Sequence, residues 1–133
     1  MRADLRNRVK RFEVSELPDE SVAYNWRCRV SPEADGVTRI ALAGELDMSV
    51  APAFRAELER ALTEHASVIV DLRALDFMDS SGMHALAAAD ARARTSGARL
   101  VIEHPAAAVL RMLELTGILD VLEVVDGSGG AAR

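Results

Sequence analysis

The segment Val-Ile-Val-Asp-Leu-Arg-Ala-Leu-Asp-Phe-Met-Asp-Ser-Ser-Gly-Met, residues 68–83, contains the pattern that decides the fold. Its apolar start, 68–72, predicts a buried parallel strand, because such strands are covered on both faces. The Ala-rich stretch that follows predicts a helix over residues 81–95, with Gly97 as a suitable stop. A tight turn therefore presents Ser80 at the start of a helix, where unpaired N–H groups and the helix dipole favour negative charge.

Two strands are predicted before this unit. Residues 26–31 alternate between apolar and polar side chains, and residues 37–43 form a second, mainly apolar stretch. The intervening segment, 32–36, is Pro-Glu-Ala-Asp-Gly, whose composition is typical of a turn. We therefore expect an antiparallel hairpin that ends at Gly-Glu-Leu-Asp, residues 44–47.

A helix is predicted between the hairpin and the strand at 68–72. Ser49 is expected to cap it, and Pro52 is tolerated in its first turn because no intrahelical N–H bond is lost there. Its apolar residues fall on one face, as in a helix that covers a sheet; they are Phe54, Leu58, Ala61 and Leu62.

The remaining sequence predicts a strand at 100–102, a helix opened by Pro105 and ended by Gly117, and a last strand at 121–125. The order β-β-α-β-α-β-α-β implies a single α/β domain. We expect a mixed, mostly parallel sheet of four or five strands with helices packed against it.

The predicted organisation is an amino-terminal arm at 1–25, one domain at 26–126 and a Gly-rich tail at 127–133. The arm has a basic cluster at 2–11, and Leu5, Val9 and Phe12 are spaced for one helical face. The sequence leaves three interpretations open: a mobile arm, an arm that docks on a partner, or a start codon assigned too early.

Composition excludes several functions. The 133-residue chain is long enough for one domain with a core, and its net charge of −5 argues against nucleic-acid binding, which needs a basic face. One cysteine, Cys28, excludes an intramolecular disulfide and a cysteine-based metal cluster. No apolar run approaches the roughly 18 residues of a membrane span, and no signal peptide is recognisable. We therefore expect no membrane contact and a cytoplasmic location.

Two serines at the predicted turn are the main functional candidates. We assign Ser81 to the helix cap, which leaves the hydroxyl of Ser80 free on the turn. The Gly-x-Ser-x-Gly elbow of hydrolases and the glycine-rich phosphate loops are absent from the sequence. The histidines lack the spacing of a zinc site; they are His65, His84 and His104. We therefore predict no enzymatic activity, no metal and no cofactor.

Residues around Ser80 form a second group of candidates. Asp47 and Asp79 each follow a predicted strand and are expected on the same edge of the sheet, where they would bind Mg²⁺, shape an encounter with a kinase or brace loop N–H groups. His84 lies one helical turn beyond Ser80, either solvated or in reach of a phosphate. The apolar residues that bracket Ser80 belong either to the core or to a partner interface; they are Phe77, Met78 and Met83.

The segments 44–47, 70–72 and 77–82 together resemble the STAS domain of bacterial anti-sigma factor antagonists, and the similarity extends over residues 26–125. The resemblance implies partner switching. The unmodified protein would bind an anti-sigma factor that is also a serine kinase of the GHKL type, and so release a sigma factor. The kinase would phosphorylate Ser80, which loosens the complex, and a phosphatase would reverse the modification.

We predict a partner surface near the phosphorylated serine, made by Asp47, Asp79, Ser81, Gly82, Met83 and His84; the resemblance matches Asp47 and Asp79 to acidic positions beside the site in the family. The closing helix of the family is absent after Asp126, so the arm or a second copy of the chain, as in a homodimer, is expected to cover that side of the sheet. Two other roles known for the family are a structural subunit of a lipid or anion transport complex and a stressosome-like scaffold.

Overall fold

The computed structural model describes residues 25–125; the predicted tail and all but the last residue of the predicted arm lie outside this range. The elements in chain order are β1 (Trp26–Pro32), β2 (Val37–Leu46), α2 (Ala51–Glu64), β3 (Ser67–Met78), α3 (Ser80–Ser96), β4 (Arg99–Glu103), α4 (Ala107–Thr116), the 3₁₀ turn η2 (Ile118–Asp120) and β5 (Glu123–Val125). This order confirms the predicted succession of strands and helices.

The five strands form one sheet in the order β1-β2-β3-β4-β5. β1 and β2 are the predicted antiparallel hairpin, and the pairs β2–β3, β3–β4 and β4–β5 are parallel. The carboxyl ends of β2 to β5 therefore meet at one edge of the sheet, together with the start of β1. We call this edge the carboxyl rim.

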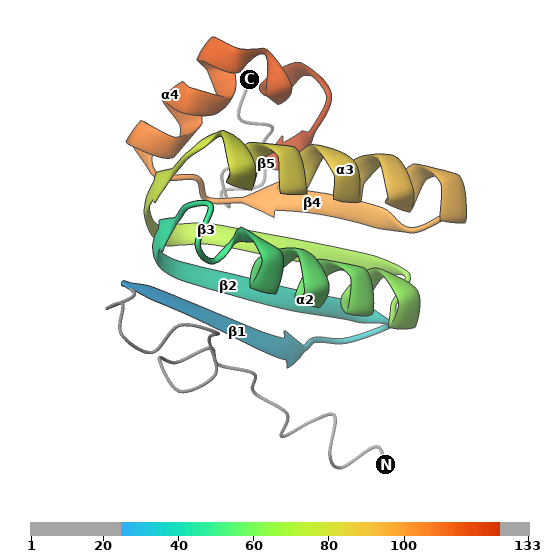
Figure 1. Cartoon of the computed structure of the whole chain (residues 1–133). Coiled ribbons are helices and arrows are strands. Elements are labelled where there is room, and N and C mark those ends of the chain that lie inside the picture. The colour runs from blue at the N-terminus through green and yellow to red at the C-terminus, as the bar shows by residue number, and fades with distance from the viewer. Residues whose placement is uncertain (1–24, 126–133) are drawn as a thin grey trace.

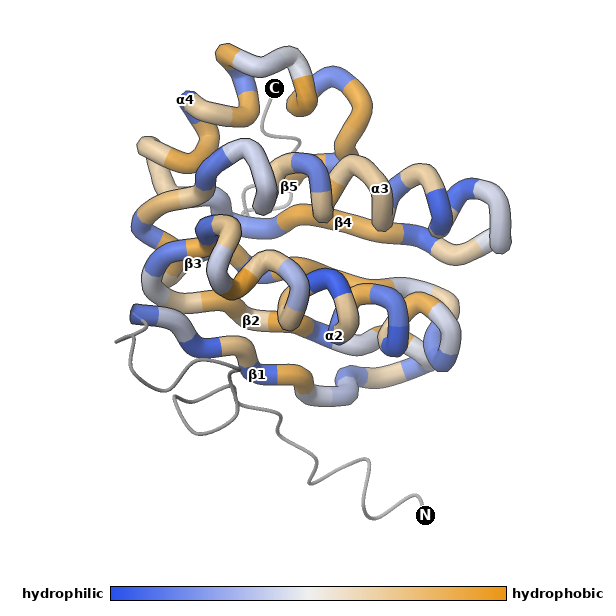
Figure 2. The backbone as a smooth tube through the Cα atoms, viewed as in Figure 1, coloured by the Kyte–Doolittle hydropathy of each residue, from blue (hydrophilic) through white to orange (hydrophobic). Residues whose placement is uncertain are grey.

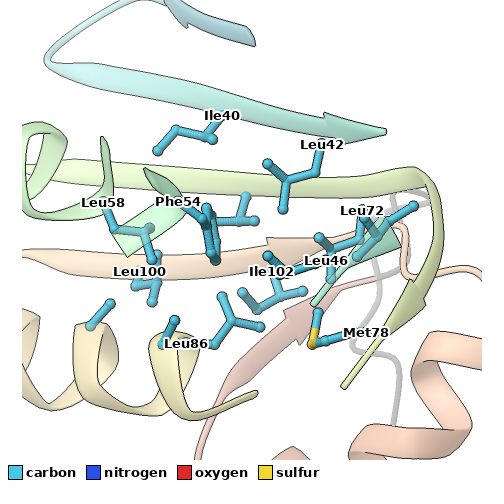
Figure 3. Packing of buried hydrophobic residues seen from close by; sticks show 14 of the residues in the cluster. Ile40, Leu42, Leu46, Phe54, Leu58, Leu72, Met78, Leu86, Leu100 and Ile102 are labelled. Atoms are coloured by element: carbon cyan, nitrogen blue, oxygen red, sulfur yellow. The ribbon is translucent and has the colours of Figure 1, made fainter. Parts of the chain in front are cut away.

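Helices α2 and α3 lie side by side on one face of the sheet (Figure 1). The core lies between this face of the sheet and the two helices. Figure 3 shows its packing for Ile40 and Ile102 of the strands and for Phe54 and Leu86 of the helices, all fully buried. Figure 2 shows the hydrophobic stretches of β3 and β4 running together through the middle of the sheet. The four apolar residues predicted for one face of α2 are all buried, so that prediction is confirmed.

Several element boundaries differ from the sequence-based prediction; β2, for example, continues to Leu46, three residues beyond the predicted 37–43. β3 continues six residues beyond the predicted 68–72. In this extension Leu72, Leu75 and Met78 turn inward at three-residue intervals, and the pairing of β3 with β2 shifts its register twice. β5 begins at Glu123 rather than residue 121, because the chain first makes the 3₁₀ turn η2. A bulged strand and a short turn do not show the simple periodicity on which the prediction depended.

The predicted cap of α2 was wrong. The residue that precedes α2 is Val50, and no side chain caps the helix. Ser49 instead donates its backbone N–H to Oδ1 of Asp47 at 2.9 Å, while the N–H groups of Val50 and Ala51 donate to the Asp47 carbonyl. Asp47 therefore closes this turn before Ser49 reaches a capping position.

Candidate functional site

Ser80 is the first residue of α3 and is exposed at the carboxyl rim. The residue that caps α3 is Asp79, not the predicted Ser81. Oδ1 of Asp79 accepts hydrogen bonds from the backbone N–H of Ser81 at 2.9 Å and of Gly82 at 3.3 Å. Aspartate and serine cap helices about equally well, so composition alone did not decide between them.

The two neighbouring serines have different surroundings. The hydroxyl of Ser81 donates to Oδ1 of Asp79 at 2.5 Å, and Ser81 is partly buried. The hydroxyl of Ser80 makes no hydrogen bond within residues 25–125 and faces solvent. Of these two serines, therefore, only Ser80 offers its hydroxyl to solvent without first breaking an internal hydrogen bond.

Asp79 also joins α3 to the loop that leads into α2. Its backbone N–H donates to the carbonyl of Leu46 at 3.1 Å, and its Oδ2 accepts from the N–H of Met48 at 3.2 Å. Asp47 and Asp79 thus lie on the same rim, and both carboxylates brace loops. In the part of the chain that the structure describes, no group of three or more His, Cys, Asp or Glu is placed to hold a metal.

The charge of Asp79 is stabilised by this geometry. Desolvation works to raise the pKa of Asp79, but it is outweighed by hydrogen bonds from the Ser81 hydroxyl and from the N–H groups of Gly82, Ser81 and Met48. The net result is a pKa of Asp79 below its ordinary value. The turn beside Ser80 therefore keeps a full negative charge at neutral pH.

The first turn of α3 offers a phosphate less than the sequence suggested. We expected the N–H groups of residues 81–83 to receive a phosphate on Ser80. In the structure those of Ser81 and Gly82 donate to the Asp79 carboxylate, and those of Gly82 and Met83 approach the Asp79 carbonyl at 3.1 and 3.2 Å. A phosphate on Ser80 would have to compete with a carboxylate that already holds these donors.

Gly82 allows α3 to approach the ends of β2 and β3 closely. A Cβ atom at this position would lie 2.7 Å from Cγ of Met78 and 2.8 Å from Cδ2 of Leu46. Real side chains do not approach so closely, so a larger residue would push the first turn of α3 outward. Gly82 therefore fixes the height of Ser80 above the rim.

Three exposed apolar side chains lie on the segments next to the first turn of α3. Met48 is 75% exposed, Phe77 46% and Leu115 70%, whereas Met78 and Met83 belong to the core. The hydroxyl of Thr116 lies 3.4 Å from Sδ of Met83, which brings the end of α4 to the first turn of α3. We call Met48, Phe77 and Leu115 the apolar collar.

A groove of about 360 Å³ runs along the collar between the end of β3 and α4. Phe77 and Leu115 line it together with mainly apolar residues of α4, and Arg111 and Asp76 also line it. The sequence-based reading considered Phe77 but missed Met48 and Leu115. The available signal was position: Met48 is an apolar residue in a polar loop, and Leu115 lies off the buried face of α4, which carries Val109 and Leu113.

The remaining sequence-predicted residue, His84, is exposed one turn beyond Ser80 on α3. Residues four apart are neighbours on a helix surface, so His84 and Ser80 lie on the same face. The structure thus brings all the predicted site residues to the carboxyl rim. It adds Met48 and Leu115 to them.

No helix among residues 25–125 is long and apolar enough to cross a membrane.

A family model described as "Mlab, STAS domain" matches residues 31–124. The chain therefore belongs to the STAS domain family.

The chain is also similar to proteins named as anti-sigma factor antagonists. An anti-sigma-B factor antagonist of Listeria monocytogenes is 30% identical over 91 residues, which are 68% of this chain and 80% of the relative. A crystal structure of an anti-sigma factor antagonist from Mycobacterium paratuberculosis is similar at 27% identity, with a TM-score of 0.63 over 74% of this chain and 84% of that one.

The antagonist SpoIIAA shares the fold. Its unphosphorylated form superposes with a TM-score of 0.65 at 20% identity and covers 75% of this chain and 89% of that one. A structure of SpoIIAA in its phosphorylated form is also similar, with a TM-score of 0.61.

Proposed function

We propose that this protein is an anti-sigma factor antagonist whose binding to an anti-sigma factor is switched off by phosphorylation of Ser80. The observation that carries the proposal is the contrast between the exposed, unbonded hydroxyl of Ser80 and the engaged hydroxyl of Ser81. Support comes from the relatives named as anti-sigma factor antagonists and from the existence of SpoIIAA in phosphorylated and unphosphorylated forms.

The proposed cycle has two states. The unmodified rim binds an anti-sigma factor that is also a serine kinase of the GHKL type, and a sigma factor is released. The kinase transfers the γ-phosphoryl group of ATP to Oγ of Ser80; the hydroxyl proton is lost and ADP leaves. A phosphatase hydrolyses the phosphoserine and restores the binding state. The chain itself contributes a surface and an acceptor hydroxyl, and no catalysis.

The switch needs only local electrostatics. A phosphate adds roughly −1.5 to −2 charge at neutral pH. Asp79 already occupies the nearest helix donors, so the phosphate charge stays on the rim, facing the partner. A like-charge contact near 4 Å costs up to about 4 kcal/mol at an effective dielectric near 20. About 2.8 kcal/mol is enough for a 100-fold loss of affinity, so no large conformational change is required.

The apolar collar is the proposed docking surface for the anti-sigma factor. It contains three of the four large apolar side chains that are exposed within residues 25–125. Burial of apolar side chains at the centre of an interface supplies affinity, and a charge introduced there is costly. A phosphate at Ser80 would add charge beside this collar, since Asp79, the residue before Ser80, is bonded to the N–H of Met48.

Mass spectrometry after incubation with the cognate kinase and Mg-ATP tests the assignment. We expect the wild-type chain and Ser81→Ala to gain one phosphate, and Ser80→Ala to gain none. The Ser81→Ala variant is the matched control, because it removes the neighbouring hydroxyl and keeps the cap residue Asp79. Phosphate on Ser81 of the wild-type chain, or on Ser80→Ala, would overturn the assignment.

A further inference from the structure

We infer that residues 2–12 dock as an amphipathic helix on the face of the sheet that points away from α2 and α3, here called the back face. The inference is independent of the proposed switch at Ser80. It starts from the one-sided arrangement of the described helices, because α2 and α3 cover the same face (Figure 1). Parallel strands are normally covered on both faces.

The back face carries a diagonal apolar stripe made by Val37, Ile69, Val101 and Val125. These residues alternate with fully buried neighbours on β2 to β5, so their side chains point away from the helices. Ile69 pairs directly with Val101. Val37 lies two pairs before Ile69, and Val125 lies two pairs beyond Val101, so the stripe runs diagonally across the strands. All four are only partly buried within the described part of the chain.

An acidic cluster lies beside this stripe. The guanidinium of Arg39 donates to Glu33 at 2.6 Å, to Asp71 at 3.1 Å and to Glu103 at 2.8 Å. Three carboxylates thus share one guanidinium, and the exposed Arg73 approaches only Asp71, at 3.8 Å. The cluster keeps a local excess of negative charge that favours a basic partner.

Small side chains leave space next to this cluster. A hollow of about 500 Å³ is lined by Ala41 and Ala74 together with Arg39 and Glu103. The opposite edge of the same face carries the exposed Arg27 and Arg29 of β1, which repel a basic segment. The complementary region is therefore the part of the back face over β2 to β5, where the exposed Arg99 of β4 is already paired with Glu123.

The chain outside the described range offers one suitable occupant. The eight residues after Val125 contain no large apolar side chain. The segment before Asn25 has Leu5, Val9 and Phe12 at the spacing of one helical face. It also carries five basic residues, Arg2, Arg6, Arg8, Lys10 and Arg11. Its apolar spacing matches the stripe, and its positive charge matches the acidic cluster.

Residues 13–24 are long enough to connect this helix to β1. Twelve extended residues span at most about 40 Å, since each adds about 3.3–3.6 Å. A five-stranded sheet is about 19 Å wide, because neighbouring strands are about 4.8 Å apart. A helix that crosses to β3–β5 is therefore within reach.

Paramagnetic NMR on the full chain tests the docking. A spin label on Asn7→Cys, on the polar side of the predicted helix, is expected to broaden the amide signals of Ile69 and Val101 at least several-fold more than that of Leu58 on α2. Adding Val9→Lys should abolish the broadening. Adding Val14→Lys, which lies off the apolar spacing, should leave it unchanged.

Two outcomes would overturn the inference. One is the absence of selective broadening at Ile69 and Val101 in the labelled Asn7→Cys chain. The other is equal broadening in a mixture of isotope-labelled chains without spin label and spin-labelled chains without isotope, which would show that a second copy covers the face. Neither readout depends on whether Ser80 is phosphorylated.

Discussion

At the scale of single residues, the difference between Ser80 and Ser81 depends on one carboxylate. The Asp79 carboxylate accepts hydrogen bonds from the Ser81 hydroxyl, from the N–H of Ser81 in α3 and from the N–H of Met48 in the loop after β2. It therefore caps α3, holds Ser81 and connects to Met48, while Ser80 remains exposed. A single side chain decides which hydroxyl is available.

The depressed pKa of Asp79 predicts a pH-dependent contribution to stability. A carboxyl group whose pKa is lower in the folded state stabilises the protein above its unfolded pKa, and this stabilisation is lost as the pH falls through the folded pKa. We expect the wild type to exceed Asp79→Asn in unfolding free energy at pH 7. The difference should shrink below about pH 4, the ordinary range of an aspartate pKa.

Urea unfolding of both proteins between pH 7 and pH 2.5 measures this difference. Asp76→Asn is the matched control, because Asp76 is exposed and makes no hydrogen bond or ion pair within the described residues. A gap between wild type and Asp79→Asn that stays constant or widens at low pH would contradict the assigned role of Asp79.

Glu57 on α2 is a buried charged residue that is expected to lower the stability of the fold. It is 2% exposed, and its Oε1 accepts no hydrogen bond among residues 25–125. An unsatisfied buried oxygen destabilises a protein by about 1–3 kcal/mol. We therefore expect Glu57→Met, of similar size, to raise the free energy of unfolding by about 1–2 kcal/mol.

Chemical denaturation at pH 7 measures the effect. The control, Glu59→Met, lies on the same helix, but Glu59 is half exposed in a surface ion pair with Arg92. Its effect should stay within about 1 kcal/mol of zero. A lower stability of Glu57→Met would contradict the assignment of Oε1 as an unsatisfied buried oxygen.

At the scale of elements, α4 and the end of β3 form the groove that the proposed partner fills. We expect Leu115→Lys to weaken binding to the cognate anti-sigma factor at least tenfold, equal to about 1.4 kcal/mol, because it puts a charge in the apolar collar. Both proteins should unfold at the same denaturant concentration, since Leu115 is 70% exposed.

The matched control for this element is Val121→Lys. Val121 is 49% exposed, but its carbonyl contacts Arg94, near the far end of α3. Fourteen helical residues separate Arg94 from Ser80, which corresponds to about 21 Å. Calorimetric affinities that fall equally for both variants would show that the collar is not the interface.

The order of the helices and strands was the feature that the sequence predicted most successfully. The order of strands and helices followed from apolar alternation and from helix-ending glycines, and Gly97 and Gly117 do end α3 and α4 in the left-handed conformation. The predicted cap of α3 was wrong because Asp79 and Ser81 are equally good candidates, and the sequence does not show the hydrogen bond from Met48, 31 residues away, that also holds Asp79. The predicted cap of α2 was wrong because Asp47 closes the preceding turn.

The candidate site was predictable in part. Ser80, Asp47 and Asp79 all followed from their positions after strands that share one edge. The collar did not follow, because the neighbourhood of Leu115 depends on how α4 packs beside α3, through Thr116 and Met83. Sequence periodicity predicts the face that a helix buries. It does not predict which exposed residues of different elements lie close together.

At the scale of the whole molecule, the sheet separates two surfaces with different proposed roles. The carboxyl rim carries Ser80 and the collar, and the back face carries the apolar stripe and the cluster around Arg39. The sheet that carries both surfaces packs on a core of buried side chains. Phosphorylation would therefore act on binding through charge at the rim, and leave the fold as it is.

The most direct measurement is the affinity of the full chain for its cognate anti-sigma factor, by calorimetry, before and after phosphorylation of Ser80. We predict a Kd at least 100-fold higher for the phosphorylated chain and for Ser80→Asp, and a wild-type Kd for Ser80→Ala. Equal affinities of the phosphorylated and unmodified chains would contradict the electrostatic switch.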